Sequence, residues 1–114
     1  MKKKNSETST FKDLLNSSKP MLIEVKADWC GGSHIIAPII QKIEQDFGNR
    51  VMIERIDYES NKSFLMDCGI ENVPSIMLVK DGKIYKLING TLSKRNLEKL
   101  IDELLNNNNH KSNN

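Results

Sequence analysis

The sequence predicts an α/β fold with a central mixed β-sheet of four to five strands flanked by about four helices. Three observations lead to this prediction. Apolar residues alternate between strand-like and helix-like spacing along the chain. A long helical segment separates the first two strand-like segments, as parallel neighbours require. An Asp81-Gly82 pair separates two later strand-like segments, which is typical of a β-hairpin. Helices on both faces would bury such a sheet.

The length and composition limit the classes of protein to consider. The chain has 114 residues, which is enough for one compact domain. Its 38% apolar and 28% charged residues are typical of a soluble globular protein, and its net charge of +2 does not indicate nucleic acid as a partner. No segment has the roughly 20 consecutive apolar residues that span a bilayer. We therefore expect neither nucleic-acid binding nor membrane insertion.

The two ends of the chain differ in composition from its middle. Residues 1–9 and 106–114 offer no apolar face to bury, so we expect disordered tails around a domain that covers residues 10–105. The basic start Met1–Lys4 is not followed by an apolar stretch, so no secretion signal is predicted. Two cysteines are too few for a disulfide scaffold and fit a reducing compartment. We expect a cytoplasmic protein.

The first half of the domain is expected to contain a helix, a strand and a longer helix. Thr10 can cap the first helix, which ends before Pro20. Residues 21–27 form a short, mostly apolar run suited to a buried strand. The next helix is closed by Gly48 and has Pro38 in its interior, which should bend it. Its apolar residues at helical spacing are Ile35, Ile36, Ile39, Ile40, Ile43 and Phe47.

The second half is expected to add a strand, a short helix, a hairpin and a final helix. Residues 51–58 form the second strand, and a shorter helix covers residues 62–67. Residues 75–80 and 83–89 are the two strands of the hairpin. Ser93 caps the last helix. The apolar stripe of that helix consists of Leu97, Leu100, Ile101, Leu104 and Leu105.

Cys30 is the candidate reactive residue. It lies between the first strand and the proline-containing helix, at or just before the helix N-terminus. Unpaired N–H groups and the helix dipole favour the thiolate there, which is the form that attacks disulfides. Gly31 and Gly32 let the backbone turn and leave the sulfur uncovered. The alternative is that Cys30 is a small buried apolar residue, which is the usual role of a free cysteine.

Two segments resemble the thioredoxin family. The run A-D-W-C-G-G-S-H at residues 27–34, with Pro38 eight residues after the cysteine, resembles the family's W-C-G-P-C segment and its helix-bending proline. The run C-G-I-E-N-V-P-S at residues 68–75 resembles the family's G-I-x-x-x-P-T loop, in which the proline is cis and faces the active-site sulfur. Residues 80–83 and 90–94 resemble the family's hairpin turn and its glycine before the last helix.

The resemblance covers residues 11–105 and implies the thioredoxin fold and thiol–disulfide oxidoreductase activity in cell redox homeostasis, with no cofactor. It also implies a monomer that acts on protein disulfides or on small thiols such as glutathione. In the family, the backbone of the residue before the proline, here Val73, pairs with an extended substrate; the alternative is a tight turn that enters a strand. The implied substrate-binding residues are Trp29, Gly31, Gly32, Val73, Pro74 and Gly90.

Ser33 departs from the family pattern, because it stands where the second, resolving cysteine should be. A hydroxyl cannot attack a mixed disulfide as that cysteine does. We therefore expect a single-cysteine enzyme, in which Cys30 forms mixed disulfides that an external thiol resolves, and dithiol reductase activity is absent or weak. Ser33 itself has two candidate roles: a hydrogen bond to the Cys30 thiolate, or a cap in the first turn of the helix.

Glu24 matches the family's buried acid beneath the active site, and Arg55 aligns with the lysine usually beside it. These two residues either relay protons during catalysis or form a structural ion pair. Lys26 replaces an aromatic residue common in the family and makes the surroundings of the sulfur more cationic.

Cys68 and His34 are further candidates for chemistry. We expect Cys68 to lie further from Cys30 than the roughly 7 Å between Cα atoms that a disulfide allows, so that it either packs under the loop or is oxidised for regulation. His34 and Cys30 have the spacing of helical metal ligands, but two ligands are too few, and no metal site is predicted. A solvent-facing His34 can donate a proton to a leaving thiol.

Three other functions are consistent with parts of the pattern. One is a redox-inactive thioredoxin-fold module that binds proteins. Another is a dithiol thioredoxin carrying an engineered Cys-to-Ser change at Ser33. The third is an iron–sulfur carrier, because single-cysteine glutaredoxins have a similar C-G-F-S segment; the residues around Gly90 do not supply the G-G-x-D stretch of those proteins.

Overall fold

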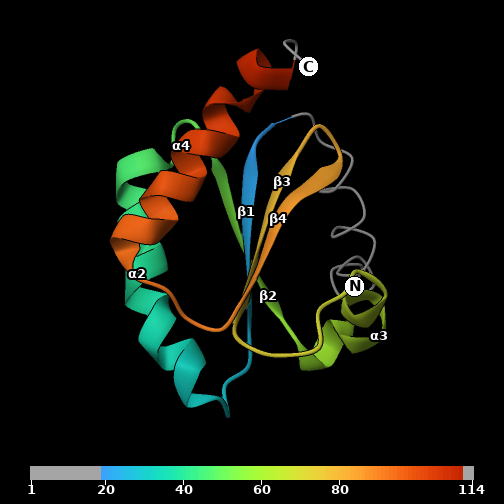
Figure 1. The fold of residues 1–114 in the computed structure, drawn as a ribbon. Helices are drawn as coiled ribbons and strands as arrows, with labels where there is room; N and C mark the ends of the chain where they lie inside the picture. The colour runs from blue at the N-terminus through green and yellow to red at the C-terminus, as the bar shows by residue number, and fades with distance from the viewer. Residues whose placement is uncertain (1–18, 112–114) are drawn as a thin grey trace, which may run out of the picture.

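The computed structural model describes residues 19–111, and the side chains of residues 19–106. In chain order its elements are β1 (Met21–Lys26), α2 (Gly31–Phe47), β2 (Met52–Asp57), the 3-10 turn η1 (Glu59–Asn61), α3 (Lys62–Asp67), β3 (Ser75–Lys80), β4 (Lys83–Asn89) and α4 (Lys94–Lys111). This order confirms the predicted α/β class (Figure 1). The helix expected after Thr10 and the tail expected at residues 1–9 lie outside the described residues.

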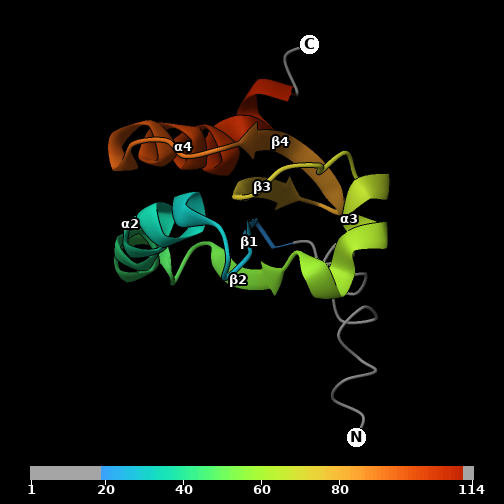
Figure 2. The ribbon, with the colours of Figure 1, turned by 90° about the horizontal axis from the view of Figure 1, so that it is seen from below.

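The four strands form one mixed sheet in the order β2-β1-β3-β4. β1 runs parallel to β2 and antiparallel to β3, and β3 pairs antiparallel with β4. Figure 2 shows α2 and α4 on one face of this sheet and α3 on the other. The helical crossover and the hairpin therefore produce the predicted combination of parallel and antiparallel pairs.

Two apolar clusters, one on each face of the sheet, form the core. Because β1 and β3 are the central strands and are covered on both faces, both have nearly continuous apolar sequences. The cluster under α2 and α4 includes Leu22, Ile36, Ile40, Ile76, Leu78, Leu97 and Ile101. The cluster under α3 includes Met21, Ile23, Val25, Leu65, Met77 and Val79. Burial of each large apolar side chain stabilises the fold by about 1.5–3 kcal/mol, so the central strands form a rigid base for the loops that follow them.

The hairpin and the short helix match the segments expected from the sequence. β3 and β4 are joined by Asp81 and Gly82, which have φ angles of 55° and 76°. Two successive positive φ angles are typical of a type I′ turn, whose twist matches the twist of the paired strands. α3 covers residues 62–67 as predicted and is preceded by the turn η1, which was not predicted.

α4 begins as expected but continues further than expected. The hydroxyl of Ser93 accepts a hydrogen bond from the Asn96 N–H at 3.1 Å, which confirms the predicted cap. The sequence predicts the domain to end at residue 105, whereas the helix runs to Lys111. Asn106 continues the helix and donates from its side chain to the Asp102 carbonyl at 2.9 Å. A helix already nucleated by a packed apolar stripe can propagate through residues of low propensity, because each added residue gains a hydrogen bond.

Within residues 19–111, no helix combines the length and the apolar character needed to cross a bilayer.

Candidate active site

Cys30 lies immediately before α2, as the sequence predicts. β1 ends at Lys26, and the chain turns through a short loop in which the Cys30 N–H donates to the Ala27 carbonyl at 3.1 Å. Cys30 is the N-cap residue of α2, with an extended backbone (φ −100°, ψ 121°). Its side chain is half-buried, so it is neither a sealed core residue nor an open surface residue. The sulfur is thus placed beside the N–H end of a helix.

The loop before β3 faces this sulfur. The peptide bond between Val73 and Pro74 is cis, as the family resemblance implies. Cys30 Sγ donates a hydrogen bond to the Val73 carbonyl oxygen at 3.4 Å, although the two residues are 43 positions apart in the chain. In the same loop, the Pro74 carbonyl accepts a hydrogen bond from the Gly90 N–H at 2.8 Å. The structure therefore places Val73 beside Cys30 and links the neighbouring Pro74 to Gly90.

Ser33 has neither of the two roles expected for it. Its side chain is only 5% exposed, and its hydroxyl oxygen accepts a hydrogen bond from the Ala27 N–H at 3.1 Å. No hydrogen bond between the side chains of Ser33 and Cys30, and no side-chain cap on α2, is present among the described residues. The hydroxyl instead ties the first turn of α2 to the end of β1, because the Ala27 N–H points at this turn and needs an acceptor.

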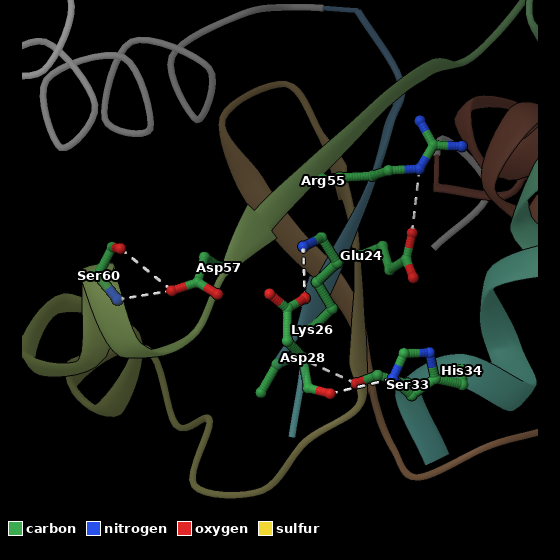
Figure 3. Close-up of polar contacts among 9 residues, drawn as sticks. Glu24, Lys26, Asp28, Ser33, His34, Arg55, Asp57 and Ser60 are labelled. Carbon is green, nitrogen blue, oxygen red and sulfur yellow. Dashed lines mark hydrogen bonds and ion pairs between the residues drawn. The ribbon is translucent and has the colours of Figure 1, made fainter. Parts of the chain in front are cut away.

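His34, the residue after Ser33 in α2, contacts the same loop. Its ring Nε2 shares a hydrogen bond with the Asp28 carbonyl oxygen at 3.0 Å (Figure 3). The side chain is exposed, as predicted. Nowhere in residues 19–111 do three or more His, Cys, Asp or Glu side chains converge as metal ligands would. The observed contact therefore gives His34 a structural role in holding the loop before Cys30.

Glu24 and Arg55 form an ion pair between neighbouring strands. They are register partners in the parallel pair β1–β2, and Arg55 Nε lies 3.3 Å from Glu24 Oε1 (Figure 3). Glu24 is 1% exposed, and within the described part of the chain neither of its oxygens has a hydrogen-bond partner. Burial raises the pKa of the Glu24 carboxyl, and the charges of Arg55 and then Lys26 oppose this shift in part. Arg55 also pairs with Glu44 at 3.0 Å, so its charge is shared.

The positive charge of Lys26 is partly neutralised by a neighbouring carboxylate. Its ammonium lies 3.8 Å from a carboxylate oxygen of Asp28 (Figure 3). The two side chains are 36% and 93% exposed, so the pair is screened by solvent. Asp28 offsets part of the cationic environment that Lys26 was expected to provide.

Trp29 is held in place by a residue that the sequence analysis missed. Its side chain is 65% exposed, and its indole Nε1 donates to Glu59 Oε2 at 3.2 Å. Glu59 comes from η1, which is 30 residues away in sequence and was not predicted. The only sequence signal for this contact was that Glu59, an acidic residue, follows the end of β2, which lies beside the end of β1.

The two glycines after Cys30 lie at the start of α2, where Gly31 is exposed and Gly32 is half-buried.

Cys68 lies at the end of α3. It is the C-cap residue of α3 and is half-buried. Burial raises the pKa of its thiol, and the neighbouring carboxylate of Asp67 raises it further. Both effects disfavour the thiolate, so Cys68 is a poor nucleophile. Both cysteines are free thiols in the structure.

Comparison with known proteins identifies relatives along nearly the whole chain. The thioredoxin family model matches residues 2–103. Thioredoxin 1 of Synechococcus elongatus is 32% identical over 98 residues, which cover 85% of this chain and 92% of that protein. The thioredoxin of Acidithiobacillus ferridurans is 33% identical over 100 residues, which cover 88% and 93%. One similar protein, thioredoxin X of Arabidopsis thaliana, is chloroplastic.

Solved structures show the same fold. Mitochondrial thioredoxin 3 from Saccharomyces cerevisiae, in its oxidised form, aligns with a TM-score of 0.76 and 25% identity, covering 83% of this chain and 88% of that chain. A chain from a study of thiol resolution in a yeast mitochondrial 1-Cys peroxiredoxin aligns with the same TM-score and 26% identity. The four-stranded mixed sheet and its helices thus agree with the sequence relationships. The chain belongs to the thioredoxin family, a family of thiol–disulfide oxidoreductases.

Proposed function

We propose that this chain is a thiol–disulfide oxidoreductase that uses Cys30 as its only redox-active cysteine. The Cys30 thiolate attacks one sulfur of a substrate disulfide and forms a new S–S bond with it. The old S–S bond breaks, and the other sulfur leaves as a thiolate that takes up a proton. One disulfide is consumed and one is formed, so this step needs no further oxidant or reductant.

The mixed disulfide is then resolved by an external thiol such as glutathione. The incoming thiolate attacks the sulfur of the bound substrate, forms a disulfide with it, and releases Cys30 as a thiolate. Deglutathionylation and disulfide exchange on proteins both fit this sequence of steps. The half-buried position of Cys30, next to the exposed Gly31, is consistent with access by an external resolving thiol.

The observation that carries this proposal is the buried hydroxyl of Ser33. It occupies the first turn of α2, three residues after Cys30, and its oxygen is already used by the Ala27 N–H. A serine cannot form a stable S–O product with the neighbouring sulfur. The only other cysteine in the chain, Cys68, lies at the end of α3 with its thiolate disfavoured. An internal resolving thiol is therefore lacking.

The remaining site residues position the sulfur and the substrate. In this proposal Trp29, Gly31, Val73 and Gly90 form the surface that receives an extended substrate, with Gly32 and Pro74 beneath them. In this proposal the ion pair between the buried Glu24 and the exposed Arg55 is structural. It relays no protons, because the chain has no resolving thiol at residue 33 that would need a proton acceptor. We further propose that the protein works as a monomer in the cytoplasm.

The change Ser33→Cys tests the proposal. We expect the unchanged chain to have little or no turnover in a dithiol assay, such as reduction of insulin disulfides by dithiothreitol, and Ser33→Cys to gain turnover. Cys30→Ser, the matched control, should be inactive in both backgrounds. High dithiol turnover by the unchanged chain would refute the single-cysteine mechanism.

A protein-binding module without redox activity is the second candidate, because two large apolar side chains near Cys30 are exposed. Trp29 is 65% and Ile35 is 61% exposed. Such a module would bind its partner equally well after Cys30→Ser, whereas the proposed enzyme would lose its covalent adducts. Non-reducing electrophoresis of adducts formed with disulfide-containing proteins distinguishes the two.

A further inference from the structure

A hydrogen-bonded pair of polar side chains lies where β3 begins and β4 ends. Ser75 is the first residue of β3 and Asn89 is the last residue of β4, and the two are register partners. The Ser75 side chain is fully buried, and its hydroxyl donates to the Asn72 carbonyl oxygen at 2.7 Å and to Asn89 Oδ1 at 3.0 Å. The single hydroxyl hydrogen is shared between these two acceptors. Ser75 therefore orients the Asn89 amide by holding its oxygen.

Asn89 lies on the same face of the sheet as Cys30 and Val73. Side chains alternate between the two faces along a strand, so Asn89 shares a face with Leu87, two residues earlier. Leu87, Cys30 and Val73 all pack against the apolar cluster under α3. The next residue, Gly90, is hydrogen-bonded to the loop before β3, and a Cβ added to it would have no atom within 4 Å. Asn89 is therefore placed at an open position beside the surface that receives the substrate in the proposed function.

The N–H groups of the Asn89 amide are available to a ligand. Asn89 is exposed, and within residues 19–106 its side chain has no hydrogen-bond partner other than Ser75. Because Oδ1 faces Ser75, the end of the amide that is left over is Nδ2 with its two N–H groups. This position thus offers hydrogen-bond donors to whatever lies beside it.

The chemistry of the neighbourhood limits which substrate side chain fits these donors. Lysine and arginine side chains carry only donors and cannot accept from Asn89 Nδ2. Acidic side chains are repelled by Glu71, an exposed carboxylate in the loop before β3. The side chains of asparagine and glutamine are uncharged and carry an acceptor oxygen. They also carry N–H groups, so they pair with Asn89 whichever way its amide is turned.

We propose that Asn89 is a specificity-determining residue that favours disulfide substrates with an asparagine or glutamine side chain near the reacting cysteine. The carbonyl oxygen of that side chain accepts a hydrogen bond from Asn89 Nδ2 while the substrate sulfur is held next to Cys30. The inference rests on the proposed function for the reaction itself, which is the attack of Cys30 on the substrate disulfide.

The kinetic test uses short peptides whose only cysteine is joined by a disulfide to thionitrobenzoate. Attack by Cys30 on the peptide sulfur forms the Cys30–peptide disulfide and releases the coloured thionitrobenzoate thiolate. Glutamine, leucine, lysine or glutamate is placed in turn at each position within two residues of the cysteine. The protein carries Cys68→Ala, so that a single thiol reacts.

We expect the glutamine peptide at its best position to react about two- to tenfold faster than the leucine peptide, which corresponds to one hydrogen bond. Lysine and glutamate should bring no such gain. Asn89→Leu should remove the preference for glutamine. Asn49→Leu, at an exposed asparagine just after α2, is the matched control and should keep it. An equal preference in the parent and in Asn89→Leu, or a faster reaction of the lysine or glutamate peptide with the parent, would overturn the proposal.

Nuclear magnetic resonance provides a readout that needs neither the reaction nor a variant at residue 89. The same peptides with serine in place of cysteine are added to the isotope-labelled Cys68→Ala protein, and the side-chain NH2 signals of Asn89 are followed. We expect larger shifts with the glutamine peptide than with the leucine peptide. Equal shifts with the two peptides would overturn the proposal even if Asn89→Leu failed to fold.

The two measurements separate this inference from the proposed function. If no peptide disulfide reacts with Cys30 while the Asn89 signals respond selectively to glutamine, the proposed function is wrong and the binding role of Asn89 stands. If all peptides react at the same rate and shift the Asn89 signals equally, the role of Asn89 is wrong and the proposed function stands.

Discussion

The hydroxyl of Ser33 is expected to make a measurable contribution to stability, and Ser33→Ala tests this directly. Ser33 is 5% exposed and Ala27 is 1% exposed, so their hydrogen bond of 3.1 Å is shielded from water. Removing the hydroxyl leaves the Ala27 N–H buried without its acceptor. An unsatisfied buried donor costs about 1–3 kcal/mol, and we expect the free energy of unfolding to fall by this amount.

Urea unfolding followed by circular dichroism is the assay. With an m-value of about 1–3 kcal/mol/M, the expected loss lowers the midpoint by roughly 0.3–3 M, and the m-value itself should not change. Ser63→Ala is the matched control, because Ser63 is an exposed serine inside α3 and its replacement should stay within about 0.5 kcal/mol of the parent. If Ser33→Ala is as stable as this control, the hydroxyl does not satisfy the Ala27 N–H and the reasoning fails.

Two further changes test the buried charge and the backbone. Burial raises the pKa of Glu24 above its ordinary value of 4.5, so its ionisation costs stability: the free energy of unfolding should fall as the pH rises above about 4.5 and level off above the folded-state pKa. Urea unfolding across this range should give Glu24→Gln a shallower fall than the parent, while Glu71→Gln, at an exposed residue, keeps the parent slope; equal slopes for all three would contradict this account. Gly90→Ala should lower the free energy of unfolding by about 1–2 kcal/mol, because the φ angle of 88° at Gly90 is strained for a residue with a Cβ. An added Cβ has no neighbour within 4 Å, so this backbone strain is the only effect expected. Gly31→Ala, placed in a helix, should lose no stability, and a Gly90→Ala variant as stable as Gly31→Ala would show that this backbone strain is absent.

The fold could be predicted from the sequence because its signals are local. The hairpin depends on Asp81 and Gly82, two adjacent residues whose preferred φ angles select the turn. The start of α4 depends on Ser93, which caps a helix that begins at the next residue. The apolar runs of β1 and β3 follow from burial on both faces of a central strand. The exception is the far end of α4, where the composition after residue 105 predicts disorder and the packed first turns propagate the helix instead.

The site could be predicted only in part, because its contacts join segments that are distant in the chain. The position of Cys30 at the start of α2 follows from the local pattern, and the cis peptide at Val73 and Pro74 follows from the family resemblance. The bond from the Ala27 N–H to Ser33 depends on how the loop after β1 turns. The bond from Trp29 to Glu59, and the close approach of Gly32 to Pro74, depend on distances between elements that no local pattern encodes.

The central claim is that Cys30 forms a mixed disulfide that an external thiol, and no residue of this chain, resolves. Intact-protein mass spectrometry after incubation with glutathione disulfide tests it most directly. We predict one added glutathionyl group on Cys30, stable after the excess reagent is removed and released when reduced glutathione is added. A Cys30→Ser variant should gain none. Spontaneous loss of the adduct with formation of an internal disulfide, or the absence of any adduct on Cys30, would contradict the account.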